Sequence, residues 1–368
     1  MSFFHIAAEL QQYDVDEFFK TVTEDRIRYI LTKEYISKEE YLCLLAPTAE
    51  KFLEEMAQKA RRLTLSNFGK AVVLYTPIYI SNYCINKCSY CGYNLDNDIK
   101  RQKLTMEEID KECKNIFETG LRHVILLTGE SRHYSPVAYI KDAVKIMRKY
   151  FDSISIEIYP LKEEEYRELV EAGVDGLTIY QETYDMKIYD KIHLEGPKKD
   201  YRFRVETPER ACRAGISSIG VGALYGLTNW RKEAYFSGLH AKYIEDNFPH
   251  MEINMSIPRI RPHAGSFTDI YDVNDKNLVQ IMVASKLFMP RAGINMTTRE
   301  SAELRDNLIP IGVTKLSAGV SVEIGGHTKK DKGEGQFEIA DGRSVKEIKN
   351  MLSNKGYCAI MKDWQCVK

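Results

Sequence analysis

The chain has 368 residues, of which 44% are hydrophobic, and a formal net charge of −1 at pH 7. This length and composition are typical of a globular protein with a sizeable core, and the near-zero charge argues against a nucleic-acid partner. No apolar run is long enough to cross a membrane, and residues 1–20 contain too many acids for a secretory signal. We therefore expect a cytoplasmic protein, with no membrane partner, whose eight cysteines stay reduced.

The N-terminal part carries amphipathic helical patterns separated by polar breaks. Ser37 followed by Glu40 is a capping-box pattern, which predicts the start of a helix, and the stretch from Ala46 to Leu63 predicts another. We expect residues 1–70 to form a helical extension.

From residue 71 onward, short β-rich runs alternate with longer stretches of helical period, which predicts repeated βα units and a parallel sheet. Thr105 and Thr207 mark the starts of two of the helices. The predicted strands are Val73–Ser81, His123–Thr128, Ser153–Tyr159, Gly176–Gln181, Ser217–Ala223, Glu252–Ile257, Gly293–Thr297 and Lys315–Val320. They predict an α/β fold, a TIM-like (βα)8 barrel over residues 71–325, with residues 326–368 packing on it as a C-terminal extension of helices and loops. In such barrels the chemistry lies at the C-terminal ends of the strands.

Three cysteines follow the first predicted strand. Cys84, Cys88 and Cys91 have C-x3-C-x2-C spacing. Three thiolates on one loop can hold three irons of a cubane iron–sulfur cluster and leave the fourth iron free for a small molecule. A structural zinc site normally has four ligands, and the next candidates in the chain are Cys113 and His123. We predict a 4Fe–4S cluster, with a zinc-stabilised, non-catalytic scaffold as the alternative from another class.

An aromatic residue, Tyr90, stands directly before the last cysteine. With it, the motif resembles the signature of the radical S-adenosylmethionine (SAM) superfamily, and this resemblance implies that SAM binds the open iron. Gly129 and Glu130 follow the second strand and resemble the Gly-Gly-Glu element that binds the SAM amino group, with Thr128 in place of the first glycine. We expect Tyr90, Gly129 and Glu130 to bind the cofactors.

The third and fourth strands end in carboxylates. Glu157 lies at an inward-compatible position, where an acid needs a cationic or hydrogen-bonding neighbour, and it either binds a cofactor or pairs with a structural arginine. Glu182 is a candidate ribose or substrate contact, with a solvated loop acid as the alternative. Arg204 offers a guanidinium fork for the SAM carboxylate, and Arg202 competes for that role.

The last two strands deliver candidate catalytic residues. Arg299 is placed to bind an amino-acid carboxylate, while Glu300 either joins the site or neutralises Arg299 in a structural pair. Ser317 is a small hydroxyl residue that leaves room for a ligand near the barrel axis. Together these residues predict a pocket for a zwitterion. His263 is left out of the predicted chemistry, because a histidine is more often structural than catalytic.

Nearly the whole chain resembles the aromatic amino-acid lyase branch of the radical SAM enzymes, and within it the tyrosine lyases of thiamine biosynthesis. The motifs that carry this resemblance are Tyr180-Gln-Glu-Thr, Pro258-Arg-Ile-Arg-Pro, Thr298-Arg-Glu, Leu316-Ser-Ala-Gly, Gln336-Phe-Glu-Ile and Asp341-Gly-Arg-Ser344. The resemblance implies cleavage of L-tyrosine to 2-iminoacetate and p-cresol, with SAM converted to 5′-deoxyadenosine and methionine. It also implies a flavodoxin or ferredoxin as electron donor, and it suggests a complex with thiazole synthase.

Two alternatives within the branch stay open. The tyrosine lyases of hydrogenase maturation look alike through the barrel but add a C-terminal domain with further cysteines. No C-x2-C pair follows the barrel here, which favours the thiamine enzymes. A lyase for another aromatic amino acid is the second alternative, and Val320, where the family commonly has serine, leaves the substrate contacts of its loop open.

Overall fold

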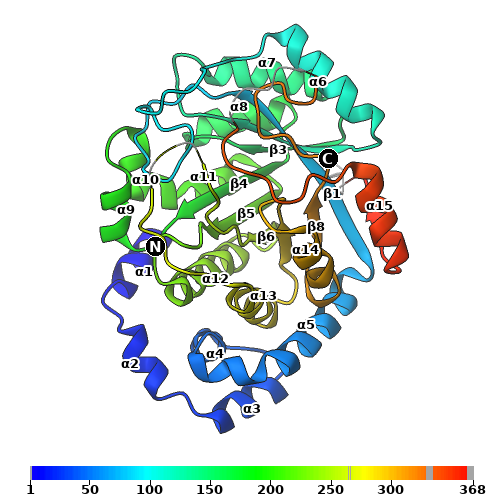
Figure 1. Cartoon of the computed structure of the whole chain (residues 1–368). Helices are drawn as coiled ribbons and strands as arrows, with labels where there is room; N and C mark the ends of the chain where they lie inside the picture. Colours follow the sequence, from blue (N-terminus) through cyan, green and yellow to red (C-terminus); the bar gives the residue numbers. More distant parts are fainter. Residues whose placement is uncertain (1, 264, 266, 329–334, 363–368) are drawn as a thin grey trace.

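The computed structural model describes residues 2–263, 265, 267–328 and 335–362. Within them, parallel strands close into a barrel surrounded by helices (Figure 1). Its strands are β1 (Ala71–Ser81), β2 (His123–Thr128), β3 (Ser153–Glu157), β4 (Gly176–Glu182), β5 (Ser218–Ala223), β6 (Glu252–Ser256), β7 (Gly293–Met296) and β8 (Lys315–Ser317). Each strand pairs with the next, and β1 pairs with both β8 and β2. The predicted TIM-like barrel is confirmed.

The predicted strands agree with the structure except at some ends. The eighth is shorter than the predicted Lys315–Val320 because Gly319 has a φ of 59°, which an extended strand does not allow. A further strand, β9 (Cys358–Ile360), lies where we expected only helices and loops. The pairing of β1 with β2 begins only at Thr76. The first three residues of β1, Ala71–Val73, pair with β9 instead.

The N-terminal helices pack outside the barrel, along α12 (Trp230–Asn247) and α13 (Asp275–Phe288) (Figure 1). They are α1 (Phe3–Leu10), α2 (Val15–Lys20), α3 (Glu24–Thr32), α4 (Lys38–Leu44) and α5 (Leu53–Phe68). The predicted capping box starts α4, with Ser37 and Glu40 bonded reciprocally. The predicted helix from Ala46 to Leu63 is wrong in its first part. A 3-10 helix occupies Pro47–Phe52, and Phe52, with φ −112° and ψ 17°, separates it from α5.

Two of the helices that cover the barrel begin where the sequence predicts them: Thr105 is the N-cap of one, and Thr207 is the first residue of the other. The covering helices are α6 (Met106–Glu118), α7 (Val137–Met147), α8 (Glu163–Ala172), α9 (Met186–Ile192), α10 (Tyr201–Val205), α11 (Thr207–Ala214), α12 (Trp230–Asn247), α13 (Asp275–Phe288), α14 (Ala302–Leu308) and α15 (Val345–Asn354). Short 3-10 helices occupy Pro197–Lys199 and Ile309–Ile311. None of the described helices combines the length and apolar character needed to span a bilayer. The division of the chain at residues 70 and 325 stays a prediction.

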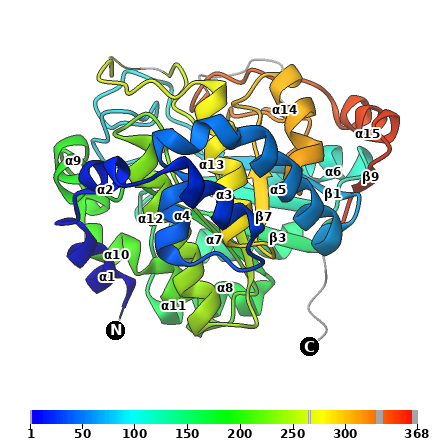
Figure 2. The same cartoon turned by 90° about the horizontal axis from the view of Figure 1, so that it is seen from below.

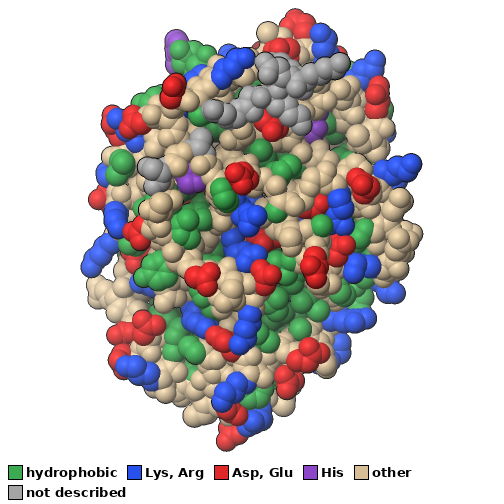
Figure 3. All heavy atoms as spheres, in the orientation of Figure 1, with side chains coloured by type: hydrophobic (Ala, Val, Ile, Leu, Met, Phe, Trp, Pro, Cys, Tyr) green, Lys and Arg blue, Asp and Glu red, His purple; other side chains and the backbone are tan. Residues whose placement is uncertain are grey.

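The segments that follow β1, β6 and β8 gather at one end of the barrel, at the top of Figure 2. This end therefore carries the C-terminal ends of the strands, where a TIM-like barrel places its functional site. Lys and Arg side chains are interspersed with Asp and Glu over the described residues of the face shown in Figure 3, as the net charge of −1 leads one to expect.

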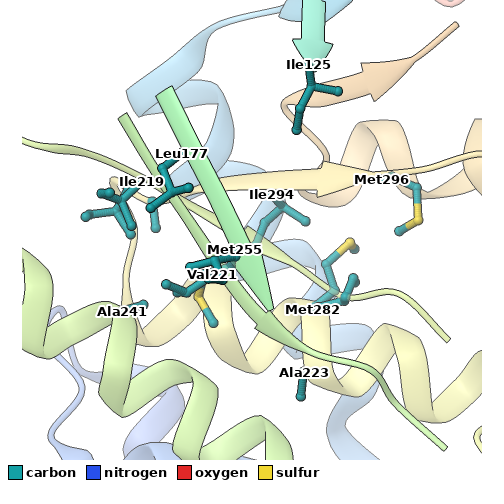
Figure 4. Close-up of a cluster of buried hydrophobic side chains, with 14 of the residues drawn as sticks. Ile125, Leu177, Ile219, Val221, Ala223, Ala241, Met255, Met282, Ile294 and Met296 are labelled. Atoms are coloured by element: carbon teal, nitrogen blue, oxygen red, sulfur yellow. The ribbon is translucent and has the colours of Figure 1, made fainter. Parts of the chain in front are cut away.

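The layer between the strands and the outer helices is apolar. Val221 of β5 lies opposite Met255 of β6, and Ala241 of α12 and Met282 of α13 lie in the same cluster (Figure 4). Alternate residues of β5 face the barrel interior instead, and there the strand has glycine. A Cβ at Gly222 would lie 2.2 Å from the carbonyl oxygen of Ser256, so no other residue fits at this inner position.

Candidate active site

A cavity opens at the C-terminal end of the barrel, with about 960 Å³ of empty volume when the open space at its mouth is included. Its walls combine aromatic and aliphatic side chains with charged ones, as in a site for a polar small molecule. The predicted site residues that line it are Tyr90, Cys91, Glu157, Glu182, Arg299 and Ser317. The structure therefore brings one predicted cluster ligand, two of the predicted carboxylates and the predicted carboxylate-binding arginine to one cavity.

The three cysteines of the loop after β1 are free thiols, and two of them have an amide donor aimed at their sulfur. The Nδ2 atom of Asn86 lies 3.7 Å from the Sγ atom of Cys84, and the Nε2 atom of Gln336 lies 4.0 Å from that of Cys91. Amide donors of this kind stabilise thiolates and cluster sulfurs.

The donor set of this loop fits a cluster. Each of three thiolates can bind a different iron of a cubane cluster, and the amide donors beside Cys84 and Cys91 stabilise such sulfurs. Among the described residues, no group of three or more His, Cys, Asp or Glu side chains is arranged to hold a single metal ion. The residues present therefore fit a 4Fe–4S cluster at Cys84, Cys88 and Cys91.

The loop after β2 is packed tightly against the cysteine loop. A Cβ at Gly129 would lie 2.4 Å from the carbonyl oxygen of Tyr83 and 3.2 Å from the Cβ of Cys84, so glycine is required by this close approach. The Oε2 atom of Glu130 accepts a hydrogen bond from Nδ2 of Asn86 at 2.6 Å, and its carbonyl oxygen accepts one from the amide of Ile85 at 2.9 Å. Gly129 and Glu130 thus lie beside the first cysteine.

Tyr90 is buried and held by a histidine that the sequence did not reveal. The Nδ1 atom of His193 lies 2.8 Å from the carbonyl oxygen of Tyr189, so Nδ1 carries the proton. Burial lowers the pKa of His193 to about 2, which keeps the ring neutral and leaves Nε2 as an acceptor. The Tyr90 hydroxyl therefore donates to Nε2 of His193 at 2.8 Å. This hydrogen bond fixes the ring of Tyr90, which lies between Cys88 and Cys91 in the sequence.

Glu182 stands between two cations. Its Oε1 atom accepts from Nζ of Lys198 at 2.7 Å and from the Arg204 guanidinium at 3.2 Å. Burial alone would raise the pKa of Glu182, but Lys198 and Arg204 outweigh it and hold the pKa below its ordinary value. Lys198 was not among the predicted site residues, because it comes from the 3-10 helix Pro197–Lys199 and not from a strand end.

Arg204 differs from its expected role. Its Nε atom donates to the carbonyl oxygen of Tyr180 at 2.8 Å, and its fork is otherwise directed at Glu182, so it lies behind this carboxylate and not on the cavity wall. Arg202, the competing candidate, pairs with Glu206 at 3.1 Å on the surface. We correct the expectation accordingly: Arg204 is a charge partner of Glu182, and neither arginine offers a free fork to a carboxylate.

Glu157 faces the cavity from the end of β3. Burial, and then the negative charge of Glu182, raise its pKa to about 7, although Arg299, Lys198 and Arg204 act in the opposite direction. The cationic neighbours that the sequence predicted for an inward Glu157 are therefore present. A cavity carboxyl with a pKa near neutrality can hold or release a proton under physiological conditions.

The wall formed by β7, β8 and the loop after β6 carries polar atoms that lack a hydrogen-bond partner within the described protein. They are Nε of Arg261, Nε2 of His263, Oδ1 of Asn295 and Oγ of Ser317. Buried polar atoms are normally satisfied, so a set of unsatisfied ones around one cavity indicates a polar ligand or water. Asn295 is the residue before the last of β7 and could have been found by the strand-end argument. His263, which the sequence analysis leaves out of the predicted chemistry, lies in the cavity wall.

Arg299 and its neighbour in sequence, Glu300, point to different places. The Arg299 guanidinium lies in the cavity wall, 3.5 Å from the ring centroid of Phe337. Glu300 is buried outside that wall, where it accepts hydrogen bonds from Nε of Arg259 at 3.0 and 3.1 Å. The expectation for Glu300 is corrected: it neutralises Arg259, and it neither lines the cavity nor pairs with Arg299.

Comparisons with known proteins identify relatives of this chain. The profile of the Radical SAM superfamily matches residues 78–236, and that of the Biotin and Thiamin Synthesis associated domain matches residues 256–358. The 2-iminoacetate synthase of Salmonella typhimurium is 37% identical over 335 residues, which are 91% of this chain and 89% of that protein.

Solved structures with the same fold include two of a hydrogenase maturase. One structure of HydG, a maturase of the FeFe-hydrogenase, has a TM-score of 0.90 and 31% identity, over 98% of this chain and 80% of its own. HydG from Carboxydothermus hydrogenoformans has a TM-score of 0.86 and 30% identity, over 97% of this chain and 82% of its own.

The closed parallel barrel, the three-cysteine loop after its first strand and the matching profile define the class: this chain is a radical SAM enzyme. Membership of this superfamily implies a 4Fe–4S cluster and SAM. Within the superfamily, the chain belongs to the 2-iminoacetate synthase family, because its identity to two curated members extends over 91% of its length. The family resemblance predicted from the sequence is confirmed.

Proposed function

We propose that this protein cleaves the Cα–Cβ bond of L-tyrosine to 2-iminoacetate and p-cresol, with conversion of SAM to 5′-deoxyadenosine and methionine. The 2-iminoacetate would serve the thiazole moiety of thiamine. The observation that carries this proposal is the 37% identity to a 2-iminoacetate synthase over 91% of the chain. The cavity supports it, because Cys91 of the cysteine loop and the Arg299 side chain line the same cavity.

Cys84, Cys88 and Cys91 are the residues that we propose as cluster ligands, with the amides of Asn86 and Gln336 as donors to the sulfurs. When bound, the cluster and SAM supply a 5′-deoxyadenosyl radical that abstracts hydrogen from the substrate. Glu130 and Glu182 are the residues that we propose as contacts of SAM. The first lies beside Cys84, and the second stands on the cavity wall with its charge maintained by Lys198.

Arg299 is the residue that we propose to bind the tyrosine carboxylate. Its guanidinium lies over Phe337 in the cavity wall, and Nη1 is 3.5 Å from the carbonyl oxygen of Arg259. Among the described residues, no carboxylate forms a salt bridge with it. Burial lowers the pKa of Arg299, yet a guanidinium stays protonated at any physiological pH. Asn295 and Ser317 supply the unsatisfied polar atoms nearby, and the aromatic walls exclude water from the reacting atoms.

The protein's contribution in this proposal is positioning. A radical reaction requires one hydrogen of the substrate to lie close to the abstracting carbon and other hydrogens to lie farther away. The cavity provides fixed donors at one wall and rigid rings at another, including Tyr79 and Tyr180. We propose a flavodoxin or ferredoxin as electron donor, a complex with thiazole synthase as the route for the unstable product, and a reducing, cytoplasmic location that preserves the thiols.

A second candidate is a tyrosine lyase of the hydrogenase-maturation type. The observation in its favour is the TM-score of 0.90 to HydG over 98% of this chain. Both candidates predict p-cresol from tyrosine, and they differ in the fate of the remaining fragment.

The test is product analysis under strict anaerobiosis. The protein, reconstituted with iron and sulfide, is incubated with SAM, tyrosine and dithionite. We expect 5′-deoxyadenosine, p-cresol and glyoxylate, the hydrolysis product of 2-iminoacetate, without cyanide or carbon monoxide. Cyanide and carbon monoxide in place of glyoxylate would favour the maturase type. Colourless protein that contains zinc and forms no 5′-deoxyadenosine would reject both.

A further inference from the structure

The turn that follows β4 carries backbone strain next to the cavity. Glu182, the last residue of β4, has a φ of 71°, the left-handed conformation that residues other than glycine rarely adopt. The register between β4 and β5 shifts at the same point, between Tyr180 and Glu182. A strained residue persists only where its surroundings hold it, so the contacts of the next residues, Thr183 to Met186, decide where the Glu182 carboxylate points.

One side of this turn is held by a buried acid of α12. Glu233 is 1% exposed and does not line the cavity. Its Oε1 atom accepts a hydrogen bond from the Thr183 hydroxyl at 2.7 Å, and its Oε2 atom accepts one from the amide of Tyr184 at 2.8 Å. A carboxylate is costly to bury, and here both of its oxygens are engaged with the two residues that follow Glu182. Glu233 thus fixes the backbone directly after the strained residue.

The other side is held by α1, which packs against α10 and α12. The side-chain amide of Gln11 donates to the carbonyl oxygen of Tyr184 at 3.0 Å, and its Oε1 atom accepts from the amide of Met186 at 3.2 Å. Phe3, which is fully buried, stacks on His240 with ring centroids 4.1 Å apart, and His240 in turn contacts the Tyr184 hydroxyl at 2.9 Å. The N-terminal helix is therefore attached to the turn at both its backbone and its side chain.

We propose that Glu233 and Gln11 are positioning residues, which hold the turn after β4 so that Glu182 keeps its left-handed conformation and presents its carboxylate to SAM. The carboxylate then occupies the place between Lys198 and Arg204. The carbonyl oxygen of Glu182 is fixed separately, by the amide of Leu224 at 2.8 Å. Release of the turn would let Glu182 relax to an extended conformation and move its side chain from the cavity wall. This inference rests on the proposed role of Glu182 toward SAM.

The test compares Gln11→Ala and Glu233→Gln with wild type and with two control variants. Gln12→Ala removes a neighbouring glutamine that is exposed, and Glu171→Gln removes an exposed acid of α8. Two quantities are measured on anaerobically reconstituted protein: the affinity for SAM by equilibrium dialysis, and hydrogen exchange at the amides of Tyr184 and Leu224. The second needs no turnover, and a general loss of stability would not confine its effect to these amides.

We expect both variants to bind SAM about tenfold more weakly, the size of effect that follows the loss of one or two net hydrogen bonds. Hydrogen exchange at the amides of Tyr184 and Leu224 should become faster. At saturating SAM, kcat for p-cresol formation should change by less than about twofold, because the substitutions lower only the population of the binding-competent conformation. In Glu233→Gln the side-chain amide has one oxygen, so it can accept a hydrogen bond from only one of the two donors. This small change is therefore enough to release one side of the turn. Gln12→Ala and Glu171→Gln should match wild type.

Unchanged SAM affinity and unchanged exchange in Gln11→Ala would overturn the inference, as would an equal loss in Gln12→Ala. If Glu233→Gln does not fold, Gln11→Ala decides alone, since Gln11 ends α1 at a partly exposed position. Failure of the proposed function gives a different result. In that case wild-type protein binds SAM, the variants bind it more weakly, and no variant or wild-type protein forms p-cresol from tyrosine.

Discussion

Gly129 lies beside the cysteine loop at a position where the structure leaves no room for a larger residue. The Cβ of an alanine there would lie 2.4 Å from the carbonyl oxygen of Tyr83, 2.9 Å from the carbonyl carbon of the same residue and 3.2 Å from the Cβ of Cys84. The obstacle is backbone, so no side-chain rotation relieves it. We predict that Gly129→Ala displaces the cysteine loop and prevents assembly of the cluster.

The magnitude follows from the same distances. Real Cβ atoms essentially never approach another atom closer than 3.0 Å, so Tyr83 or Gly129 must move by at least 0.6 Å. Such overpacking costs about 1–3 kcal/mol, which a folded protein of this size tolerates. Metal sites are less tolerant, because their ligand distances hold to within about 0.2 Å. We therefore expect a folded protein in which Cys84, next to Tyr83, no longer reaches its iron.

The assay measures iron, acid-labile sulfide and the electron paramagnetic resonance signal after anaerobic reconstitution, together with thermal unfolding. Gly342→Ala is the matched control, because a Cβ at Gly342 meets no atom within 4 Å. We expect Gly342→Ala to resemble wild type. Gly129→Ala should unfold at a temperature a few degrees lower and should contain little cluster. Full iron and sulfide with a wild-type signal in Gly129→Ala would refute the reasoning, because it would show that the two loops move together and keep the site.

Three further predictions concern the cavity. Cys88→Ala should abolish both the cluster and 5′-deoxyadenosine formation, and a variant that keeps either would show that this cysteine is not a ligand. Arg299→Ala should raise KM for tyrosine by roughly a hundredfold, the effect of losing a charge-assisted contact, while cleavage of SAM without tyrosine changes little; equal losses in both reactions would indicate a structural role. Burial and the charge of Glu182 raise the pKa of Glu157 to about 7, so the folded state favours the protonated form of this carboxyl. The free energy of unfolding of the wild type should therefore fall, relative to that of Glu157→Gln, as the pH rises from about 4.5 to 7. The expected fall is at most about 3 kcal/mol. Melting curves that run parallel with pH for the two proteins would contradict this assignment.

The fold was predictable because its signals are local. The alternation of β-rich runs with helical periods marks each βα unit within the unit itself, and parallel order then follows from the connections. The cysteine motif is equally local, since its three cysteines lie within eight residues of sequence. Gly129 could be anticipated because a glycine at a strand end permits close backbone approach, and the structure shows what approaches it.

Side-chain partners were harder to predict, because the sequence shows which side chains are charged and does not show where they point. Arg299 and Glu300 are adjacent, yet one faces the cavity and the other pairs with Arg259, 41 residues away. Arg202 and Arg204 are equally basic, and only the buried one reaches Glu182, since the short helix α10 places them on different faces. Each of these pairs required the packed arrangement of segments distant in sequence.

For the N-terminal helices, too, the local sequence pattern does not reveal the functional contacts. Their patterns predict amphipathic cover for a barrel, and nothing local to Gln11 or Glu233 distinguishes them from ordinary surface or helix residues. Yet both contact the residues directly after Glu182, from positions 173 and 49 residues away from Tyr184. A strained strand end persists only where its surroundings hold it, and Gln11 supplies part of that support here. We therefore infer that part of the extension over residues 1–70 stabilises the active site although it lies outside the cavity.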